Sequence, residues 1–463
     1  MRRPLSKLPA NYRKYYCLSD YLSLAEKVLR WSRIRGAGHA EVYIENGEEF
    51  SVHVRNDSIE SLKQSSFKGL GLRVFLGNKT GFSFTTDFSK PALESTIDSA
   101  CSLADLSDAD ENNVLPRAVL SPCDDLELFD PHVQDMSPDQ KILLAKSLEQ
   151  KVYENDARIT HTEGAGFTNT TSSIHVLNSK GSSGSYSMTL SRISVSPVAA
   201  WGGVRTNETW YSYSRFFDKL DSTDKIAAIA VERTVRLLGA RKIQTTQADV
   251  IFEPPCGVTF LSSFFSLING DNVNRELSFL KDEIEKQIAP DFLTIIDDGS
   301  LRGKLGSRPF DGEGVPTSRQ VIVENGVLKK FMYDTKAALR AGTESTGHAH
   351  RRYDSEITIG VNNLFIEKGT QTPEEIIQKT GRGLLITKLM GFGFDPVSGV
   401  FSYGASGLWI DNGSPVYPVH EVVVASNMKD MLKNIMSVGN DLEFRGPMAC
   451  PTLKIADMTI SGN

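Results

Sequence analysis

The sequence lacks three features that would each point to a class of protein. None of its apolar runs approaches the roughly 20 residues of a membrane-spanning helix, so we expect no membrane association. No apolar segment follows its basic N-terminal stretch, so no secretory signal is expected. Its formal net charge is -6 at pH 7, whereas nucleic-acid binding requires clustered Lys and Arg. By elimination, we expect a cytoplasmic protein that binds neither membranes nor nucleic acid.

Cysteine is scarce as well. The number of cysteines is odd and no two form a CxxC pair, which favours a reducing compartment over a disulfide framework. Two of them adjoin proline in apolar surroundings, where we expect buried and unreactive thiols. These two are Cys256 and Cys450, and the others are Cys17, Cys101 and Cys123.

Several enzyme motifs are also missing. There is no Walker phosphate loop and no strand–GxGxxG–helix unit, which argues against nucleotide binding. There is no GxSxG elbow, so nothing marks a serine nucleophile. With 40% hydrophobic and 23% charged residues, the composition is instead that of an ordinary globular protein. A chain of 463 residues is then long enough for about two to four domains with large cores.

The periodicity of apolar residues predicts an α+β protein. Segments with helical spacing alternate with strand-like segments in the first half, and strand signals dominate the second half. We therefore expect N-terminal mixed sheet-and-helix units followed by a β-rich C-terminal domain. The predicted units are an N-terminal α+β domain over 1–106, a linker over 107–130, a middle α+β domain over 131–242 and a β-rich domain over 243–463.

Three Asn-Gly pairs lie between strand-like segments. This dipeptide is the strongest short-range signal for a two-residue hairpin, because both of its positions tolerate positive φ. The sequence therefore predicts tight hairpins at Asn46-Gly47, Asn325-Gly326 and Asn412-Gly413.

Metal-ligand patterns are weak. A zinc peptidase helix needs two histidines on one face with a glutamate beside the first, and the only His-Glu pair, His420-Glu421, lies in a strand-like segment. His348 and His350 are two residues apart, so on a strand they would face the same side and could share a metal. They are equally at home in a polar loop, and no third ligand is evident nearby.

Four acidic residues cluster in the sequence just before these histidines. Such carboxylates could do acid–base work or hold a cation. They could equally cap turns around the neighbouring glycines, and we favour this second interpretation. The residues are Asp297, Asp298, Asp311 and Glu313.

Two sets of motifs together resemble one known family. The first set holds Ala40-Glu41-Val42-Tyr43, Lys68-Gly69-Leu70-Gly71-Leu72-Arg73-Val74 and Gly81-Phe82-Ser83. The second set holds Pro309-Phe310-Asp311-Gly312-Glu313-Gly314-Val315-Pro316-Thr317, Gly342-Thr343-Glu344-Ser345-Thr346-Gly347, Gly404-Ala405-Ser406-Gly407 and Asn434-Ile435-Met436-Ser437-Val438-Gly439-Asn440-Asp441-Leu442. This combination resembles the TldD/PmbA family, whose active members are zinc peptidases. One departure is Gly347-His348-Ala349, where the family usually reads Gly-Asn-Ala.

The resemblance also distinguishes two branches. TldD-like members carry HExxxH on a helix and a later cysteine ligand in a Gly-x-Cys-Gly-Lys context. The matching helix here is Cys256 to Leu267, which presents Leu261, Ser262 and Ser266 at the motif positions. The stretch from Arg445 to Leu453 resembles the PmbA (TldE) branch, which lacks the Cys-Gly-Lys segment. We therefore identify no catalytic residue and no metal ligand in this chain, apart from the candidates His348 and His350.

The resemblance implies a role and partners. It implies a non-catalytic subunit that pairs with a TldD-type chain, or forms a homodimer in its absence. The complex would be a cytoplasmic zinc peptidase for unfolded or leader peptides, with zinc on the partner and no cofactor in this chain. Alternatives are a self-sufficient metal-dependent hydrolase and a regulatory binding protein of the gyrase-modulator type. Glycine permits close backbone approach, so the candidate substrate groove is Gly391, Gly393, Gly404, Ala405, Ser406 and Gly407.

Overall fold

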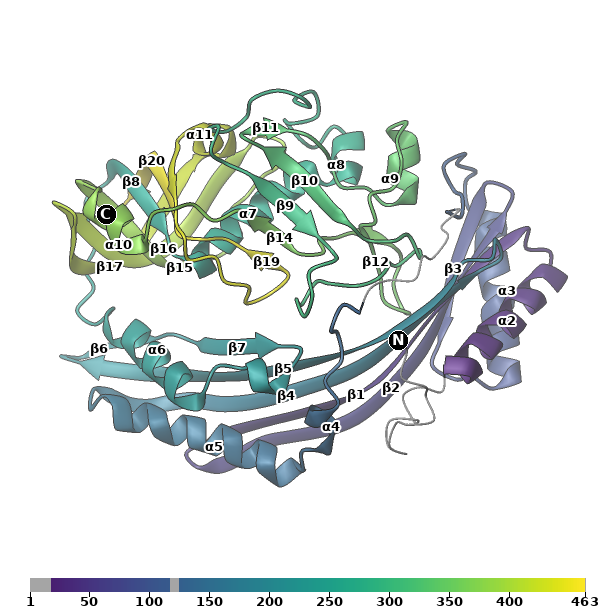
Figure 1. The fold of residues 1–463 in the computed structure, drawn as a ribbon, viewed down its shortest axis with the longest axis horizontal. Coiled ribbons are helices and arrows are strands. Elements are labelled where there is room, and N and C mark those ends of the chain that lie inside the picture. Colours follow the sequence, from purple (N-terminus) through teal and green to yellow (C-terminus); the bar gives the residue numbers. More distant parts are fainter. Residues whose placement is uncertain (1–17, 117–124, 463) are drawn as a thin grey trace.

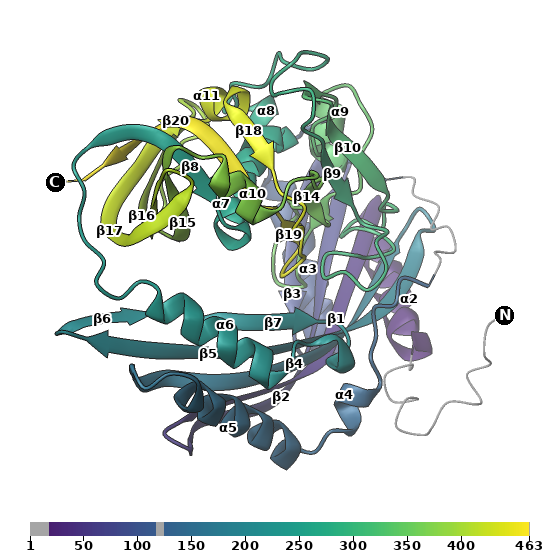
Figure 2. The same ribbon diagram turned by 60° about the vertical axis from the view of Figure 1, so that its left-hand side comes forward.

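A long curved sheet and a compact β-rich part make up the molecule. In this computed structural model, residues 18–116 and 125–462 are described. The β-rich part lies on the concave side of the sheet, above strands β4, β5 and β7 in Figure 1 and Figure 2. Part of the predicted linker, residues 117–124, and the cysteines Cys17 and Cys123 lie outside the described residues.

The curved sheet is antiparallel and follows the order β3-β2-β1-β4-β5-β6, with β7 paired to β5. Its strands are β1 (His39–Arg55), β2 (Ser58–Leu76), β3 (Lys79–Thr85), β4 (Ile159–Asn178), β5 (Ser183–Trp201), β6 (Val204–Asn207) and β7 (Trp210–Ser214). The helices of this half are α2 (Leu18–Ile34), α3 (Lys90–Leu106), α4 (His132–Asp135), α5 (Pro138–Asn155), α6 (Thr223–Val235) and the 3-10 turn η2 (Phe217–Lys219).

Alternation along β1 assigns the two faces of the sheet. Even-numbered residues such as Val42 and Val52 are buried under helices, with α2 and α3 covering one end and α5 and α6 the other. Odd-numbered residues such as Glu41 and Tyr43 point to the concave face, because successive side chains of a strand alternate. The concave face therefore carries the polar residues that meet the C-terminal part.

The predicted hairpin at Asn46-Gly47 is wrong. Both residues lie inside β1, where they pair with β2 on one side and β4 on the other. A Cβ on Gly47 would lie 2.1 Å from the carbonyl oxygen of Thr171, so glycine is required there for close packing rather than for a turn. The turn instead occupies Asn56 and Asp57, both with positive φ (51° and 58°), as a tight hairpin needs.

The two predicted N-terminal units share one sheet. β1 from the first unit pairs with β4 from the second over the whole stretch from Glu41 to Val54. The sequence patterns of the two units are local and contain no signal for this pairing. The sequence therefore predicts two units but does not predict that backbone hydrogen bonds between β1 and β4 join them into one sheet.

The C-terminal part contains a closed ring of strands. The order β17-β16-β15-β8-β20-β18 has an additional β17–β20 pairing, which closes the ring around an apolar core. A second sheet has the order β11-β10-β9-β14-β19, and β12 pairs with β13. Its strands are β8 (Thr246–Phe252), β9 (Ile295–Asp298), β10 (Arg319–Glu324), β11 (Val327–Leu328), β12 (Ala349–His350), β13 (Thr358–Ile359), β14 (Leu364–Ile366), β15 (Arg382–Met390), β16 (Val400–Asp411), β17 (Ser414–Asn427), β18 (Ile435–Val438), β19 (Met448–Ala449) and β20 (Leu453–Ser461).

The helices of the C-terminal part are short except for one. The longest, α7, starts with two prolines and is packed into the core between the two sheets. They are α7 (Pro254–Ile268), α8 (Gly270–Asn274), α9 (Thr335–Arg340), α10 (Pro373–Gln378) and α11 (Met428–Lys433). The predicted hairpins at Asn325-Gly326 and Asn412-Gly413 are confirmed, with positive φ at all four residues.

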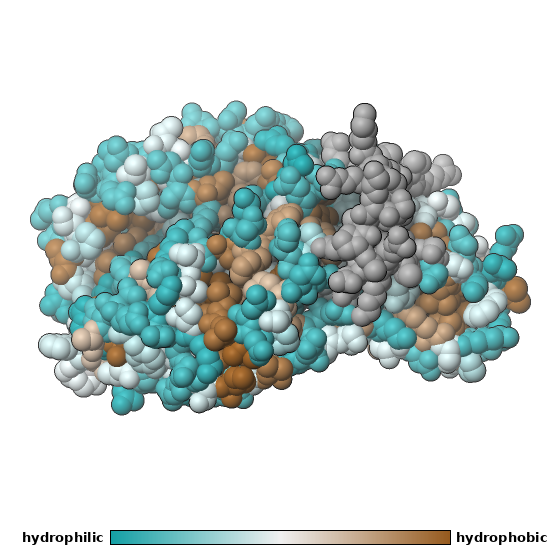
Figure 3. All heavy atoms as spheres, turned by 60° about the horizontal axis from the view of Figure 1, so that its bottom comes forward, coloured by the Kyte–Doolittle hydropathy of each residue, from teal (hydrophilic) through white to brown (hydrophobic). Residues whose placement is uncertain are grey.

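The α+β fold class is confirmed: mixed sheets and helices in the first half precede a β-rich second half. No helix in the described part of the chain is long and apolar enough to cross a membrane. On the face seen in Figure 3, hydrophobic side chains form patches interrupted by polar ones.

Candidate functional site: the cleft between the sheet and the C-terminal part

Two adjoining cavities lie where the concave face of the sheet meets the C-terminal part. Their volumes are about 590 Å³ and 640 Å³. Both are lined by Tyr211 of β7 and by the segment Arg445-Gly446-Pro447, which precedes β19. We call the first the helix cavity, because α7 forms one wall, and the second the sheet cavity, because β4, β5 and β7 form its floor.

The helix cavity contains a buried ion cluster at the start of α7. Glu253, which precedes this helix, accepts hydrogen bonds from Arg233 (2.7 Å) and from both terminal nitrogens of Arg236 (2.8 Å each). Arg233 also lies over the ring of Trp210, 4.7 Å from its centroid. These contacts tie the end of α6 to the start of α7, so the wall of the cavity is fixed from both parts of the molecule.

The exposed side of α7 carries no metal-binding side chain. Leu261 is fully buried in the core, Ser262 lines the helix cavity and Ser266 donates to the backbone of Ser262 at 3.4 Å. Cys450, which the sequence predicts to be a buried and unreactive thiol, packs where a Cβ on Gly257 would lie, 2.6 Å from its sulfur. Burial raises the pKa of the Cys450 thiol, which disfavours the thiolate that a metal binds.

The sheet cavity is lined by arginine and tyrosine. Arg192 of β5 pairs in register with Tyr213 of β7, and its guanidinium lies 5.4 Å from that ring and 5.3 Å from the ring of Tyr211. Arg215 lies at the edge and is almost completely buried. Arg445 completes the set from the C-terminal part, with its guanidinium 4.4 Å from the Trp210 ring.

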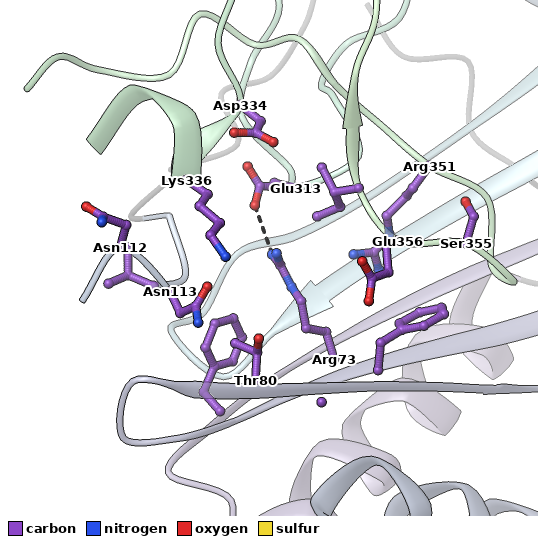
Figure 4. A pocket seen from close by; sticks show the side chains of 15 residues that line it. Arg73, Thr80, Asn112, Asn113, Glu313, Asp334, Lys336, Arg351, Ser355 and Glu356 are labelled. Atoms are coloured by element: carbon purple, nitrogen blue, oxygen red, sulfur yellow. Dashed lines mark hydrogen bonds and ion pairs between the residues drawn. The ribbon is translucent and has the colours of Figure 1, made fainter. Parts of the chain in front are cut away.

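A third, smaller cavity of about 140 Å³ lies at the other end of the interface (Figure 4). Arg73 of β2 reaches from the sheet to the carboxylate of Glu313 at 2.9 Å, and Asp334 and Lys336 lie beside that carboxylate. Arg73 also contacts Glu41 at 3.3 Å. Burial and the carboxylates of Glu313 and Asp271 raise the pKa of Asp334 to about 6. These groups form one electrostatic cluster, in which Glu41 and Glu313 are buried and Lys336 is partly exposed.

Four of the family-like motifs, those at 40–43, 68–74, 81–83 and 309–317, contribute residues at or beside this cluster. Glu41 of β1 binds both Arg73 and Arg351, and the Arg351 guanidinium lies 4.6 Å from the ring of Tyr43. The ring of Tyr353 occupies the space where a Cβ on Gly69 would be, at 2.0 Å. Motifs that are far apart in the sequence thus share one function in the fold: they hold the C-terminal part against the sheet.

Two of the four acidic residues that cluster in the sequence cap turns. Asp311 Oδ1 accepts from the backbone N–H of Glu313 and of Val315, each at 2.9 Å. Asp298 Oδ1 accepts from the N–H and the hydroxyl of Ser300. The other two make contacts with distant residues instead: Asp297 contacts His348 and accepts from the N–H of Asn362, and Glu313 accepts from Arg73 and from the N–H of Thr335. The turn-capping interpretation therefore describes Asp298 and Asp311 only.

His348 and His350 have separate surroundings. His348 is fully buried and uses both ring nitrogens, Nδ1 with Thr346 Oγ1 at 2.8 Å and Nε2 with Asp297 Oδ1 at 3.0 Å. His350 Nδ1 accepts from Arg308 at 3.4 Å, and burial and that cation lower its pKa. The cationic guanidinium beside His350 would repel a metal ion, and both ring nitrogens of His348 are already hydrogen-bonded. These surroundings disfavour a metal shared by the two histidines.

The glycine-rich groove candidates lie in and beside strands β15 and β16. Ala405 is fully buried, Ser406 is nearly so, and a Cβ on Gly407 would lie 2.0 Å from the carbonyl oxygen of Leu385. Gly404 lies in the same strand, Gly391 has a positive φ of 86°, and Gly393 lies against the backbone of Ser402. None of the six lines the helix cavity or the sheet cavity. Gly393 and Gly407 permit close approach of neighbouring backbone, and Gly391 permits a turn.

Comparison with known proteins gives the family. The descriptions PmbA/TldA metallopeptidase domain 1, central domain and C-terminal domain match residues 40–104, 131–238 and 245–462. The metalloprotease PmbA of Escherichia coli O157:H7 is 34% identical over 426 residues, covering 91% of this chain and 92% of that protein. This chain belongs to the TldD/PmbA metallopeptidase family. The resemblance carried by its sequence motifs is therefore confirmed.

Two further proteins are similar to this member of the TldD/PmbA family at lower identity. A metalloprotease TldD homolog of Buchnera aphidicola subsp. Acyrthosiphon pisum is 24% identical, covering 92% of this chain and 93% of that protein. A solved structure from Bacteroides thetaiotaomicron, whose proposed role is modulation of DNA gyrase, has a TM-score of 0.88 and 27% identity. It covers 96% of this chain and 99% of that chain.

The donor set of this TldD/PmbA member does not fit the metal that the family name implies. All eight histidines of the sequence lie in the described part, and none lines the helix cavity or the sheet cavity. Within residues 18–116 and 125–462, no three His, Cys, Asp or Glu side chains are grouped to hold a metal ion. We therefore derive no chemical step through a metal in this chain.

Sequence reasoning missed the residues of the sheet cavity. Arg192, Tyr211 and Tyr213 belong to no motif, and they converge only because β7 folds back onto β5. The one usable signal was the alternation of aromatic residues in Trp210-Tyr211-Ser212-Tyr213, which places two tyrosines on one face of a strand.

Proposed function

We propose that this chain is the metal-free subunit of a cytoplasmic TldD/PmbA-type zinc peptidase. In this proposal a TldD-type partner carries the zinc, and the chain contributes a cleft that binds unfolded or leader peptides. In the absence of the partner, the chain would form a homodimer.

One observation carries the proposal: at the positions of α7 that match the TldD-like motif, Leu261 and Ser266 stand for its two histidines and Ser262 for its glutamate, and Leu261 is buried in the core. A leucine side chain has no donor atom for zinc, and a neutral serine is a poor substitute for imidazole. The 34% identity to a PmbA, against 24% to a TldD homolog, supports the same branch.

The cleft supports peptide binding in an extended form. The helix cavity and the sheet cavity adjoin at Tyr211 and Arg445, so a single chain segment could occupy both. Their walls combine apolar and aromatic side chains with a few charged groups, as in sites that bind ligands through burial and orient them through polar contacts.

The test is zinc content and peptide cleavage by the purified chain, alone and mixed with a TldD-type chain from the same genome. We expect no zinc and no cleavage from the chain alone, and cleavage on mixing. Stoichiometric zinc together with cleavage by the chain alone would overturn the proposal. A His348→Ala variant that abolished such activity would then favour a self-sufficient hydrolase.

The partner arm needs its own control. The TldD-type chain is measured alone at the same concentration, because any cleavage that it performs unaided sets the baseline. We expect the mixture to exceed this baseline and to elute as one complex in size-exclusion chromatography. A mixture that stays at the baseline, with the two chains eluting separately, would contradict the subunit role.

A further inference from the structure

The floor of the sheet cavity is built from one face of three strands. Thr170 of β4, Leu190 and Arg192 of β5, and Tyr211 and Tyr213 of β7 all line it. They are cross-strand neighbours: Thr170 pairs with Leu190, and Arg192 with Tyr213. Rigid strands, rather than loops, therefore fix the position of the Arg192 guanidinium.

Arg192 has aromatic neighbours but no carboxylate partner among the described residues. Its Nε is buried without a hydrogen-bond acceptor, and its guanidinium lies beside two tyrosine rings whose planes are nearly perpendicular, at 89°. Contact with aromatic rings stabilises the cation. It provides no hydrogen-bond acceptor for the N–H donors, which lie in the plane of the guanidinium. Nε is buried, so the donors left for a ligand in the cavity are those of the two terminal nitrogens.

The other charged residues of the cavity are also arginines. Arg215 donates only to backbone carbonyls, those of Lys304, Leu305, Thr189 and Ser307. Burial, with Arg308 nearby, lowers its pKa to about 10, so it stays charged at neutral pH. Arg445 is partly neutralised by Glu443 at 2.8 Å. No aspartate or glutamate is among the described residues that line the cavity.

We propose that the sheet cavity is a subsite for a carboxylate of the bound peptide, with Arg192 as its receptor. The inference rests on the proposed peptide-binding role and adds the class of residue that the cleft selects. The planar guanidinium fork matches a carboxylate through two parallel hydrogen bonds. The apolar residues Met188, Leu190 and Leu305 would cover the aliphatic carbons beside that carboxylate.

Two peptide groups share this chemistry: an Asp or Glu side chain and the C-terminal carboxylate. Three fluorescent-labelled unstructured peptides separate them. One carries internal glutamates and an amidated C-terminus, the second has glutamines in their place and a free C-terminus, and the third has glutamines and an amidated C-terminus. Binding of each to the full chain is followed by fluorescence anisotropy.

We expect at least one carboxylate-bearing peptide to bind about tenfold more tightly than the neutral peptide, a difference that shrinks as salt is raised. Arg192→Gln should remove this preference, so that the three peptides bind with similar affinity. Arg192→Lys should retain part of it, because a point charge replaces a fork. The matched control is Arg205→Gln, an exposed arginine on β6 of the same sheet, which should keep the preference intact.

The outcomes separate this inference from the role on which it rests. Equal binding of all three peptides by the unaltered chain, or a preference that survives in Arg192→Gln, would overturn the subsite while leaving peptide binding in place. No binding of any peptide would overturn both. Circular dichroism of each variant checks that the sheet is retained.

Discussion

At the scale of single residues, Asp334 should make stability depend on pH. Its pKa is raised to about 6 in the folded protein, so the folded state holds this proton more tightly than the unfolded chain. Stability from this group is fully present below the unfolded pKa of about 4, and is lost as pH rises through about 6.

Asp334→Asn should therefore remove this pH-dependent loss of stability. The amide oxygen of the asparagine can still accept the hydrogen bond from the N–H of Ala337, which Asp334 Oδ1 accepts at 2.7 Å. The free energy of unfolding, measured by urea titration from acidic to neutral pH, should fall for the unaltered chain relative to the variant by on the order of 2 kcal/mol. Parallel curves for the two proteins across this range would show that the carboxyl titrates normally.

The sequence motifs include residues of the cluster around Glu313, but they do not predict which of these residues contact one another. Glu41, Arg73 and Glu313 belong to motifs that carry the family resemblance, yet their pairing joins residues 240 positions apart, Arg73 with Glu313. Arg192 gave no signal at all, because a lone arginine in a strand looks like any solvated residue. Its significance depends on which acids are absent around it, and only the packed structure shows its neighbours.

At the scale of secondary-structure elements, the three Asn-Gly pairs show what local patterns determine. At Asn325-Gly326 and Asn412-Gly413 the backbone adopts the left-handed conformation that the dipeptide favours. At Asn46-Gly47 the same letters lie inside β1, because pairing with β2 and β4 together outweighs the local turn preference. The dipeptide cannot indicate its pairing with β4, because that strand lies more than a hundred residues later in the sequence.

Gly47→Ala should therefore be destabilising even though alanine is usually tolerated in place of glycine. The new Cβ would lie 2.1 Å from the carbonyl oxygen of Thr171 and 2.7 Å from the ring of Phe67, so β1 and its neighbours must separate. We expect a loss of about 2 kcal/mol in the free energy of unfolding, measured by chemical denaturation.

Gly381→Ala is the matched control. A Cβ there would meet nothing within 4 Å, and Gly381 is not among the residues with positive φ. Restricting the unfolded chain should leave this variant as stable as the parent or slightly more so. Equal effects at Gly47 and Gly381 would mean that the close approach in β1 is not under strain.

At the scale of the whole molecule, Glu253 couples the curved sheet to the C-terminal part. It is the only carboxylate among the described residues within hydrogen-bond distance of both Arg233 and Arg236. Glu253→Gln keeps the volume but leaves the largely buried Arg233 without a carboxylate partner, and Arg236 with only the exposed Glu232 at 3.7 Å. Removing one partner of such a buried cluster costs about 3 kcal/mol.

In calorimetry, we expect Glu253→Gln to lower the unfolding temperature and to separate the transition of the sheet half from that of the C-terminal part. Glu232→Gln serves as the control, because its carboxylate lies 3.7 Å from Arg236 and is 61% exposed. It should change stability by less than about 0.5 kcal/mol. A single, unshifted transition for the Glu253 variant would contradict the coupling.

The shared sheet shows that the modules defined by the family descriptions are not separate structural units. The family descriptions divide the chain into three inherited modules, with one boundary between residues 104 and 131. Yet β1, from the first module, has β4, from the second, as its hydrogen-bonded neighbour along nearly its full length. A gene cut at that boundary would yield two polypeptides with unpaired strand edges, which are templates for aggregation. The first two modules, separate in the family descriptions, therefore depend on each other to complete one sheet when the chain folds.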